Sequence, residues 1–93
     1  MAATIRVEKE SEGRFRVTVT EGRSETSHVV TLAADYAQKL TGGKVGPEEF
    51  IRRSFEFLLE REPKESILRQ FDLPVIGRYF PEYEREIRRR LGN

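Results

Sequence analysis

The sequence predicts a single α+β domain in which a three-stranded antiparallel meander is followed by about four helices packed on one face of the sheet. Two observations predict this class. Apolar and polar residues alternate with a period of two in the first third, and apolar residues recur at helical spacing in the rest. The chain has 93 residues, the size of one small domain. We expect a β-meander at 1–32, a helical pair at 33–62 and a C-terminal helical segment at 63–93.

Two predicted turns define the meander, and the strand registers that they set agree with each other. The first is a three-residue loop at Ser11-Glu12-Gly13 with Gly13 in the left-handed conformation, and the second is a two-residue loop at Gly22-Arg23. Both registers place the same side chains on one face, which a slip of one residue would not do. The predicted buried face consists of Ile5, Val7, Phe15, Val17, Val19, Val30 and Leu32.

The other face of the predicted sheet is rich in arginine and threonine, and two interpretations stay open. It is either a platform for phosphate or RNA, or a solvated face with the cross-strand ion pairs Glu8–Arg16 and Glu10–Arg14. The solvated interpretation is favoured because no aromatic residue is exposed there for base stacking.

Two helices are predicted around a glycine turn. The first covers 33–40 and ends at Gly42-Gly43, and the second starts at Pro47 and breaks at Pro63. The apolar side chains of the second helix cover an arc of about 200°, which is wider than the ~100° stripe that packing on one sheet requires. This helix therefore needs cover on two sides, from the sheet and from either the C-terminal segment or a second subunit.

The C-terminal third is predicted to be helical in three pieces. "KESILRQF" adds about two turns, "LPVIGRYF" forms a short piece that Asp72 can cap, and Pro81 starts a last helix. The last helix carries the i,i+4 pairs Glu84–Arg88 and Glu86–Arg90. The apolar patch at 67–80 is either a lid over the protein's own core or a contact with a partner or second copy, and exchange of the segment between subunits would combine the two.

Composition excludes several kinds of chemistry. The formal net charge of +1 argues against a dedicated nucleic-acid coat, and the absence of cysteine excludes disulfides and thiolate sites. No apolar run is long enough to span a membrane, and "MAATIRVEKE" lacks the apolar region of a signal peptide. We therefore expect a cytoplasmic protein of bacterial type.

The candidate catalytic residues are few. His28 is the only histidine, and the predicted register turns it inward opposite Val17, which favours hydrogen-bonded packing over a role as catalyst or ligand. None of Ser27, Ser54 and Ser66 has the glycines of a nucleophile elbow. "TGGKVG" lacks the spaced first glycine and the following Ser or Thr of a phosphate-binding loop. We expect no enzyme activity and no catalytic, cofactor or metal site.

The favoured function is a non-enzymatic interaction module that binds another protein or a second copy of itself. The wide apolar arc of the long helix and the aromatic segment after it motivate this hypothesis. The candidate contact residues are Phe57, Leu73, Val75, Ile76, Tyr79, Phe80 and Tyr83.

The competing function is a nucleic-acid-binding regulator that uses arginines of the sheet and of the C-terminal end. Those residues are Arg14, Arg16, Arg88, Arg89 and Arg90. The near-neutral charge and the two glutamates at the start of the long helix count against it. The terminal arginines have a second interpretation, as a solvated helix end.

Residues 27–60 resemble a ribbon-helix-helix unit, with the strand "SHVVTL", the short helix "AADYAQKL", a glycine turn and the helix "GPEEFIRRSFEFLL". Members of that family dimerise through strands and helices and read DNA with the paired ribbon. The resemblance therefore implies a transcriptional regulator or antitoxin-type protein, with Ser27, His28 and Thr31 as polar readers. The whole chain is also similar to small bacterial proteins described as hypothetical, which implies no mechanism.

Overall fold

The computed structural model describes residues 3–92 and contains a mixed four-stranded sheet. The strands are β1 (Thr4–Ser11), β2 (Arg14–Glu21), β3 (Ser24–Thr31) and β4 (Gln70–Asp72), in the order β1-β2-β3-β4. The first three strands are antiparallel neighbours, and β4 lies parallel to β3. The α+β class is confirmed, whereas the expectation of a purely antiparallel three-stranded sheet is wrong because β4 joins it.

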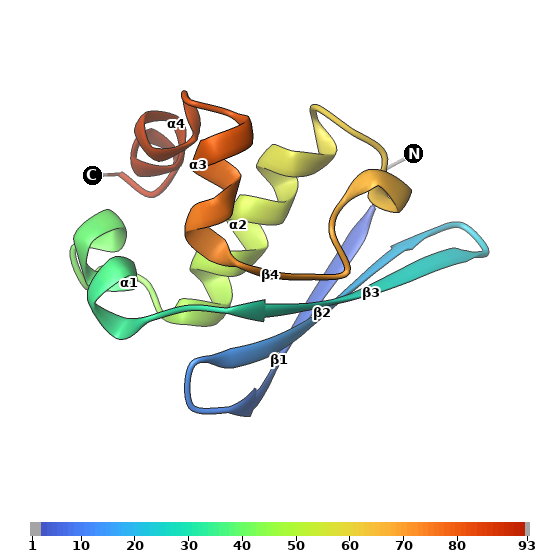
Figure 1. Cartoon of the computed structure of the whole chain (residues 1–93), viewed down its shortest axis with the longest axis horizontal. Coiled ribbons are helices and arrows are strands. Elements are labelled where there is room, and N and C mark those ends of the chain that lie inside the picture. The colour runs from blue at the N-terminus through green and yellow to red at the C-terminus, as the bar shows by residue number, and fades with distance from the viewer. Residues whose placement is uncertain (1–2, 93) are drawn as a thin grey trace.

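The helices lie over one face of this sheet (Figure 1). They are α1 (Ala34–Thr41), α2 (Pro47–Leu59), α3 (Ile76–Tyr79) and α4 (Tyr83–Arg90), with the 3-10 turns η1 (Lys64–Ser66) and η2 (Leu73–Val75). Gly42 ends α1 in the left-handed conformation, and Pro47 occupies the first turn of α2. Both boundaries agree with the sequence prediction, since glycine tolerates a positive φ and proline needs no N–H partner at a helix start.

The predicted strand registers are confirmed except at one residue. The pairs found include Ile5 with Val19, Val7 with Val17, Phe15 with Val30, and Val17 with His28. Glu10 lies in an irregularity between Lys9 and Ser11, so it does not oppose Arg14 as predicted. Its carboxylate nevertheless accepts hydrogen bonds from both Arg14 (3.3 Å) and Arg16 (2.8 Å). Glu8 opposes Arg16 but makes its ion pair with Arg6, at 3.8 Å.

Strand β4 replaces a predicted helix. The two helical turns expected for "KESILRQF" are wrong, because only η1 forms and the chain then runs extended into β4. Two hydrogen bonds to β3 explain the extended path: Val29 N–H donates to the Arg69 carbonyl (2.8 Å), and His28 Nδ1 lies 2.9 Å from the Leu68 carbonyl oxygen. Tertiary pairing with an open strand edge therefore prevails over the local helical pattern.

Helix α2 packs on the sheet with one side and under the C-terminal segment with the other. Phe50, Ile51, Phe55 and Phe57 are fully buried. The Phe57 ring lies 5.3 Å from the ring centre of Tyr83, and the Tyr83 hydroxyl lies 2.7 Å from Ser54 Oγ. The C-terminal segment is therefore a lid over the protein's own core. Its buried members include Leu73, Ile76, Tyr83 and Ile87.

Because the C-terminal segment covers the core, two tyrosines of neighbouring helices should differ in how much they contribute to the free energy of unfolding. Tyr83→Ala removes a fully buried ring, and it should lower the free energy of unfolding by about 3–5 kcal/mol, as for other large-to-small core substitutions. Tyr79 is 65% exposed, so Tyr79→Ala should change stability by no more than about 0.5 kcal/mol. Urea unfolding of both variants measures the difference, and equal losses would contradict the lid.

Candidate functional site

The described residues form a mostly apolar pocket above the inner side of β4. The pocket has a volume of about 190 Å³. The end of α2, the extended segment before β4, β4 itself and α3 build its walls. We call it the β4 pocket, and its lining residues are Leu58, Glu62, Ser66, Ile67, Leu68, Phe71, Val75, Ile76, Tyr79 and Phe80.

Two side chains at the β4 pocket are unusual for the surface of a small protein. Leu68 is 46% exposed and Tyr79 is 65% exposed, and these are the exposed large hydrophobic residues of the described chain. Leu68 belongs to the extended segment before β4 and Tyr79 to the end of α3. Both line the pocket, so the exposed apolar surface gathers at one place, where it marks a candidate binding region.

Glu62 is the one carboxylate among the residues that line the pocket. Burial raises the pKa of this carboxyl above its ordinary value. None of the hydrogen bonds or ion pairs found among residues 3–92 involves the Glu62 side chain. A half-buried carboxylate beside apolar walls favours a ligand that brings its own hydrogen-bond donor.

The outer edge of β4 offers backbone groups for pairing. The Arg69 carbonyl points to β3, where it accepts from Val29 N–H. Successive residues of a strand direct their backbone groups to opposite sides, so the N–H and C=O groups of Gln70 and Asp72 point away from β3. Within the described part of the chain, the sheet ends at β4. Phe71 turns its side chain inward to the pocket.

His28 holds the β4 segment in place. It is fully buried on the inner face, 5.4 Å from the ring centre of Phe55, with Nδ1 against the Leu68 carbonyl and Nε2 2.8 Å from Thr26 Oγ1. Burial lowers the pKa of this imidazole. The neutral ring satisfies both contacts, with Nδ1–H donating to Leu68 and Nε2 accepting from Thr26. His28 is therefore a positioning residue for the pocket wall.

The structure divides the predicted protein-interaction residues into two groups. Phe57, Leu73 and Tyr83 are fully buried in the core, and Ile76 is buried as well, although it also lines the β4 pocket. Val75, Tyr79 and Phe80 line the β4 pocket. The interaction role of these residues stays a prediction.

Sequence reasoning missed Glu62, Leu68 and Phe71 as members of a site. Leu68 and Phe71 belong to "KESILRQF", for which the sequence predicts two helical turns. No local signal marks the extended path, because it depends on pairing with β3. The proline that follows Glu62 is a usable signal, since it excludes a helix that continues past Glu62. In the structure α2 ends at Leu59, and Glu62 follows in the turn after it.

The predicted nucleic-acid residues do not form one surface. Arg14 and Arg16 belong to β2 on the sheet and share the Glu10 carboxylate, whereas residues 88–90 belong to α4 in the helical layer (Figure 1). Arg89 pairs with Glu86, and Arg90 pairs with Glu60 and Glu86. The predicted Glu84–Arg88 pair is not formed. Instead, Glu84 accepts a hydrogen bond from the Tyr36 hydroxyl and lies 3.9 Å from Lys39 Nζ.

Comparisons with known proteins return no match to a family model, a curated protein or a solved structure. The ribbon-helix-helix resemblance therefore stays a prediction. In this structure β3 has β2 on one edge and β4 on the other, so pairing of β3 with a second subunit would require β4 to leave.

Two further properties of the described residues concern other kinds of site. No helix within residues 3–92 has the length and apolar character needed to cross a membrane. The same residues contain no group of three or more His, Cys, Asp or Glu side chains arranged to hold a metal ion.

The burial of His28 predicts a pH dependence of stability. Its pKa is lower in the folded chain than the ordinary value of 6.5, so the unfolded chain binds the proton more tightly. The free energy of unfolding should be highest above pH 6.5 and should fall as the pH decreases from 6.5 toward the folded pKa. Denaturant unfolding from pH 8 to 5.5 measures this change above the range in which most carboxylates titrate.

The matched variant is His28→Gln, whose amide can donate to Leu68 but cannot titrate. It should lose the pH dependence in this range whatever its absolute stability. An unchanged pH profile in the variant would contradict the assignment to His28.

Proposed function

We propose that this protein is a non-enzymatic protein-binding module. An extended segment of a partner protein adds as a strand beside β4 and places an apolar side chain in the β4 pocket. The observation that carries this proposal is the position of a mostly apolar pocket directly above an open strand edge. Strand addition uses the edge for backbone hydrogen bonds and the pocket for side-chain selection.

The alternation of side chains along a strand explains how the open edge of β4 and the β4 pocket would bind the same segment. Side chains alternate between the two faces of a sheet, and the β4 side chain on the inner face is that of Phe71, which lines the pocket. A segment paired with β4 would direct alternate side chains to the same inner face. One of them would meet the pocket, while Gln70 and Asp72 supply the outward backbone groups.

The other edge of the sheet is less suited to strand addition. Strand β1 carries a dense run of charged side chains, Arg6, Glu8, Lys9 and Glu10, and all four are exposed. Charged residues on an edge strand discourage pairing with another chain. Strand β4 is short, but apolar side chains surround it on the inner side.

Glu62 indicates which side chains the bound segment of the partner should carry. Its carboxylate lies among apolar walls and has no partner within residues 3–92, so a donor from the ligand would satisfy it. We expect the bound segment to carry an apolar residue with a lysine, arginine or similar donor nearby. Arg69 lies next to β4 in the chain, and none of the ion pairs found among residues 3–92 involves it, so an acidic residue at the flank of the segment would add complementarity.

The test selects peptides from a random nine-residue library on the immobilised protein and measures the binding of the selected peptides by fluorescence anisotropy. Gln70→Pro removes the outward N–H without removing a hydrogen bond to β3, because proline lacks this donor. It should weaken binding by about tenfold or more, the equivalent of one lost hydrogen bond of about 1.4 kcal/mol. Gln70→Ala keeps the N–H and should bind normally.

Two further results decide the proposal. Selected peptides should have apolar residues at alternate positions, and Glu62→Gln should weaken the peptides that carry a lysine or arginine. Selection that yields no binders, or binders equally sensitive to both Gln70 variants, would contradict strand addition. Light scattering over a range of protein concentrations identifies a second copy as the partner if Gln70→Pro, but not Gln70→Ala, dissociates a dimer.

A further inference from the structure

The charged side chains are distributed unevenly over the molecule. All 17 Lys and Arg residues belong to the described residues, and most of them have a carboxylate within 4.0 Å. Among the carboxylates of residues 3–92, six of the cations find none at this distance, although Lys44 Nζ donates to the Gly92 carbonyl at 2.9 Å. These six are Arg23, Lys44, Arg69, Arg78, Arg85 and Arg88.

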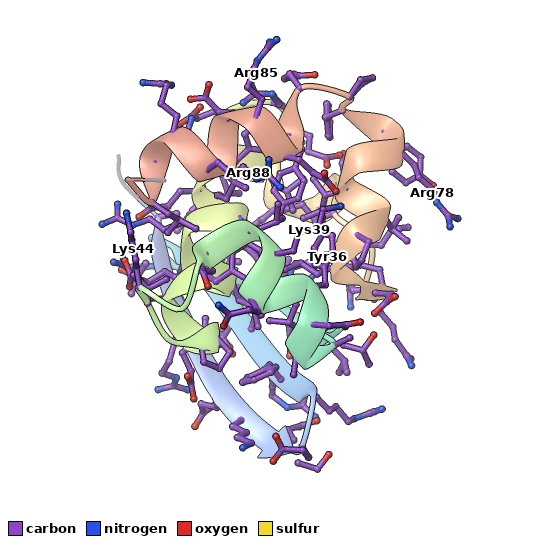
Figure 2. The ribbon with its side chains drawn as sticks, turned by 90° about the vertical axis from the view of Figure 1, so that its left-hand side faces the viewer. Tyr36, Lys39, Lys44, Arg78, Arg85 and Arg88 are labelled. Atoms are coloured by element: carbon purple, nitrogen blue, oxygen red, sulfur yellow. The ribbon has the colours of Figure 1, made fainter. Side chains whose placement is uncertain are left out.

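Four of these six cations lie in the centre or at the edges of the face that is turned to the viewer in Figure 2; Lys44 follows α1, Arg78 belongs to α3, and Arg85 and Arg88 belong to α4. Figure 2 shows Lys44 at one side of this face and Arg78 at the other, with Arg88 and Lys39 between them and Arg85 above. We call these five side chains the helical cationic face. Lys44, Arg78 and Arg85 are exposed, and Arg88 is half-buried.

Two acidic residues of the neighbouring helices do not cancel this charge. Glu84 is 3.9 Å from Lys39 and accepts the Tyr36 hydroxyl, and Asp35 accepts a hydrogen bond from the Tyr36 N–H at the start of α1. Glu82 also lies close enough to interact with Arg85, although it makes its ion pair with Arg61. Five cations therefore have three carboxylates near them in a chain whose net charge is only +1. The positive potential of the whole molecule is concentrated on one side, which can attract a polyanion.

We propose that the helical cationic face binds the phosphate backbone of double-stranded nucleic acid. Three of its five cations are arginines, whose planar guanidinium groups suit phosphate oxygens. The molecule measures 28 by 21 Å when viewed on this face. A duplex carries one phosphate charge per ~1.7 Å of its axis, so a length equal to the shorter dimension presents roughly a dozen phosphates, more than enough for five cations.

The side chains of the face favour a duplex over a single strand or a membrane. Tyr36 is half-buried, and its hydroxyl is bound to Glu84, so its ring is not free for base stacking as single-strand binding requires. The exposed large hydrophobic residues, Leu68 and Tyr79, line the β4 pocket instead. The face therefore has no apolar side chain to insert into a bilayer. Contacts with phosphate alone would bind the duplex without sequence preference.

The test is the salt dependence of binding to a labelled 20-base-pair duplex of mixed sequence, measured by fluorescence anisotropy. With five phosphate contacts, the logarithm of the association constant should fall with the logarithm of salt concentration with a slope of about −4.5, or about 500-fold between 50 and 200 mM salt. The variant Lys44→Gln/Arg78→Gln/Arg85→Gln should bind more weakly at 50 mM salt and have a slope of about −2.

The matched control is Arg6→Gln/Arg23→Gln/Arg69→Gln, which changes the net charge equally but away from the helical cationic face. It should keep the wild-type slope. Glu84→Gln removes a carboxylate from the face while its amide oxygen can still accept the Tyr36 hydroxyl, and it should bind a few-fold more tightly. Parallel titrations use duplex RNA, a single-stranded oligonucleotide, phosphatidylserine vesicles and a polyglutamate peptide.

The outcomes separate the possible ligands. Binding of duplex DNA or duplex RNA that is weakened by the face variant alone supports the proposal and identifies which duplex is preferred. Absence of duplex binding at 20 mM salt, or an equal loss in the face variant and the control, overturns it. Binding of vesicles or polyglutamate without duplex binding also overturns it and assigns the face to a membrane or an acidic protein. Gln70→Pro should leave duplex binding intact, so this test is independent of the β4 pocket.

Discussion

The structure depends on the double-sided burial of helix α2. Phe55 faces the sheet and lies 5.4 Å from His28, whereas Phe57 faces the C-terminal segment and lies 5.3 Å from Tyr83. Both rings are fully buried. A domain of this size buries only about two-thirds of the surface of its unfolded chain, so it has little apolar surface to leave uncovered. Residues 63–92 therefore act first as part of the core.

The β4 pocket follows from the path that this cover requires. After α2 ends, the chain crosses the edge of the sheet before it returns as η2, α3 and α4. It crosses as an extended strand, because β3 offers an unpaired edge and His28 offers a contact for the Leu68 carbonyl. An extended segment is thinner than a helix and fills less space beneath α3. The pocket and the open edge of β4 are two results of the same crossing.

Ion pairs join the C-terminal segment to the rest of the protein and leave one side of it positively charged. Arg61 pairs with Glu82 and lies over the Phe57 ring, and Arg90 pairs with Glu60 at the contact between α2 and α4. Exposed pairs of this kind contribute little stability individually. Their larger effect is on the distribution of charge, because they use carboxylates near α2, whereas Arg85 and Arg88 of α4 make no ion pair within residues 3–92. Two consecutive residues of α3 therefore belong to different surfaces. Arg78 is part of the helical cationic face, and Tyr79 lines the β4 pocket.

The sequence by itself determined the meander, nearly all of its registers, the end of α1 and the start of α2, whereas α2 ends at Leu59 and does not continue to Pro63. These features depend on residues close together in the chain: a glycine with positive φ at each turn, alternation along each strand, and proline and glycine at the helix ends. The apolar arc of α2 also indicated that a second cover was needed. The one local error in the registers, at Glu10, arises because an irregular position in a strand has no strong signal in side-chain pattern.

Only the tertiary structure decided what supplies that cover and where the surfaces lie. "KESILRQF" has an acceptable helical pattern, and it becomes a strand because β3, some 40 residues earlier in the chain, offers hydrogen bonds. On an isolated helix, Glu84 has the spacing to pair with Arg88. In the folded chain, its carboxylate contacts Tyr36 and Lys39 of α1 instead. Both outcomes depend on contacts between segments far apart in sequence. A local pattern specifies which conformations are possible, and packing selects among them because long-range hydrogen bonds and burial exceed the small differences in local propensity.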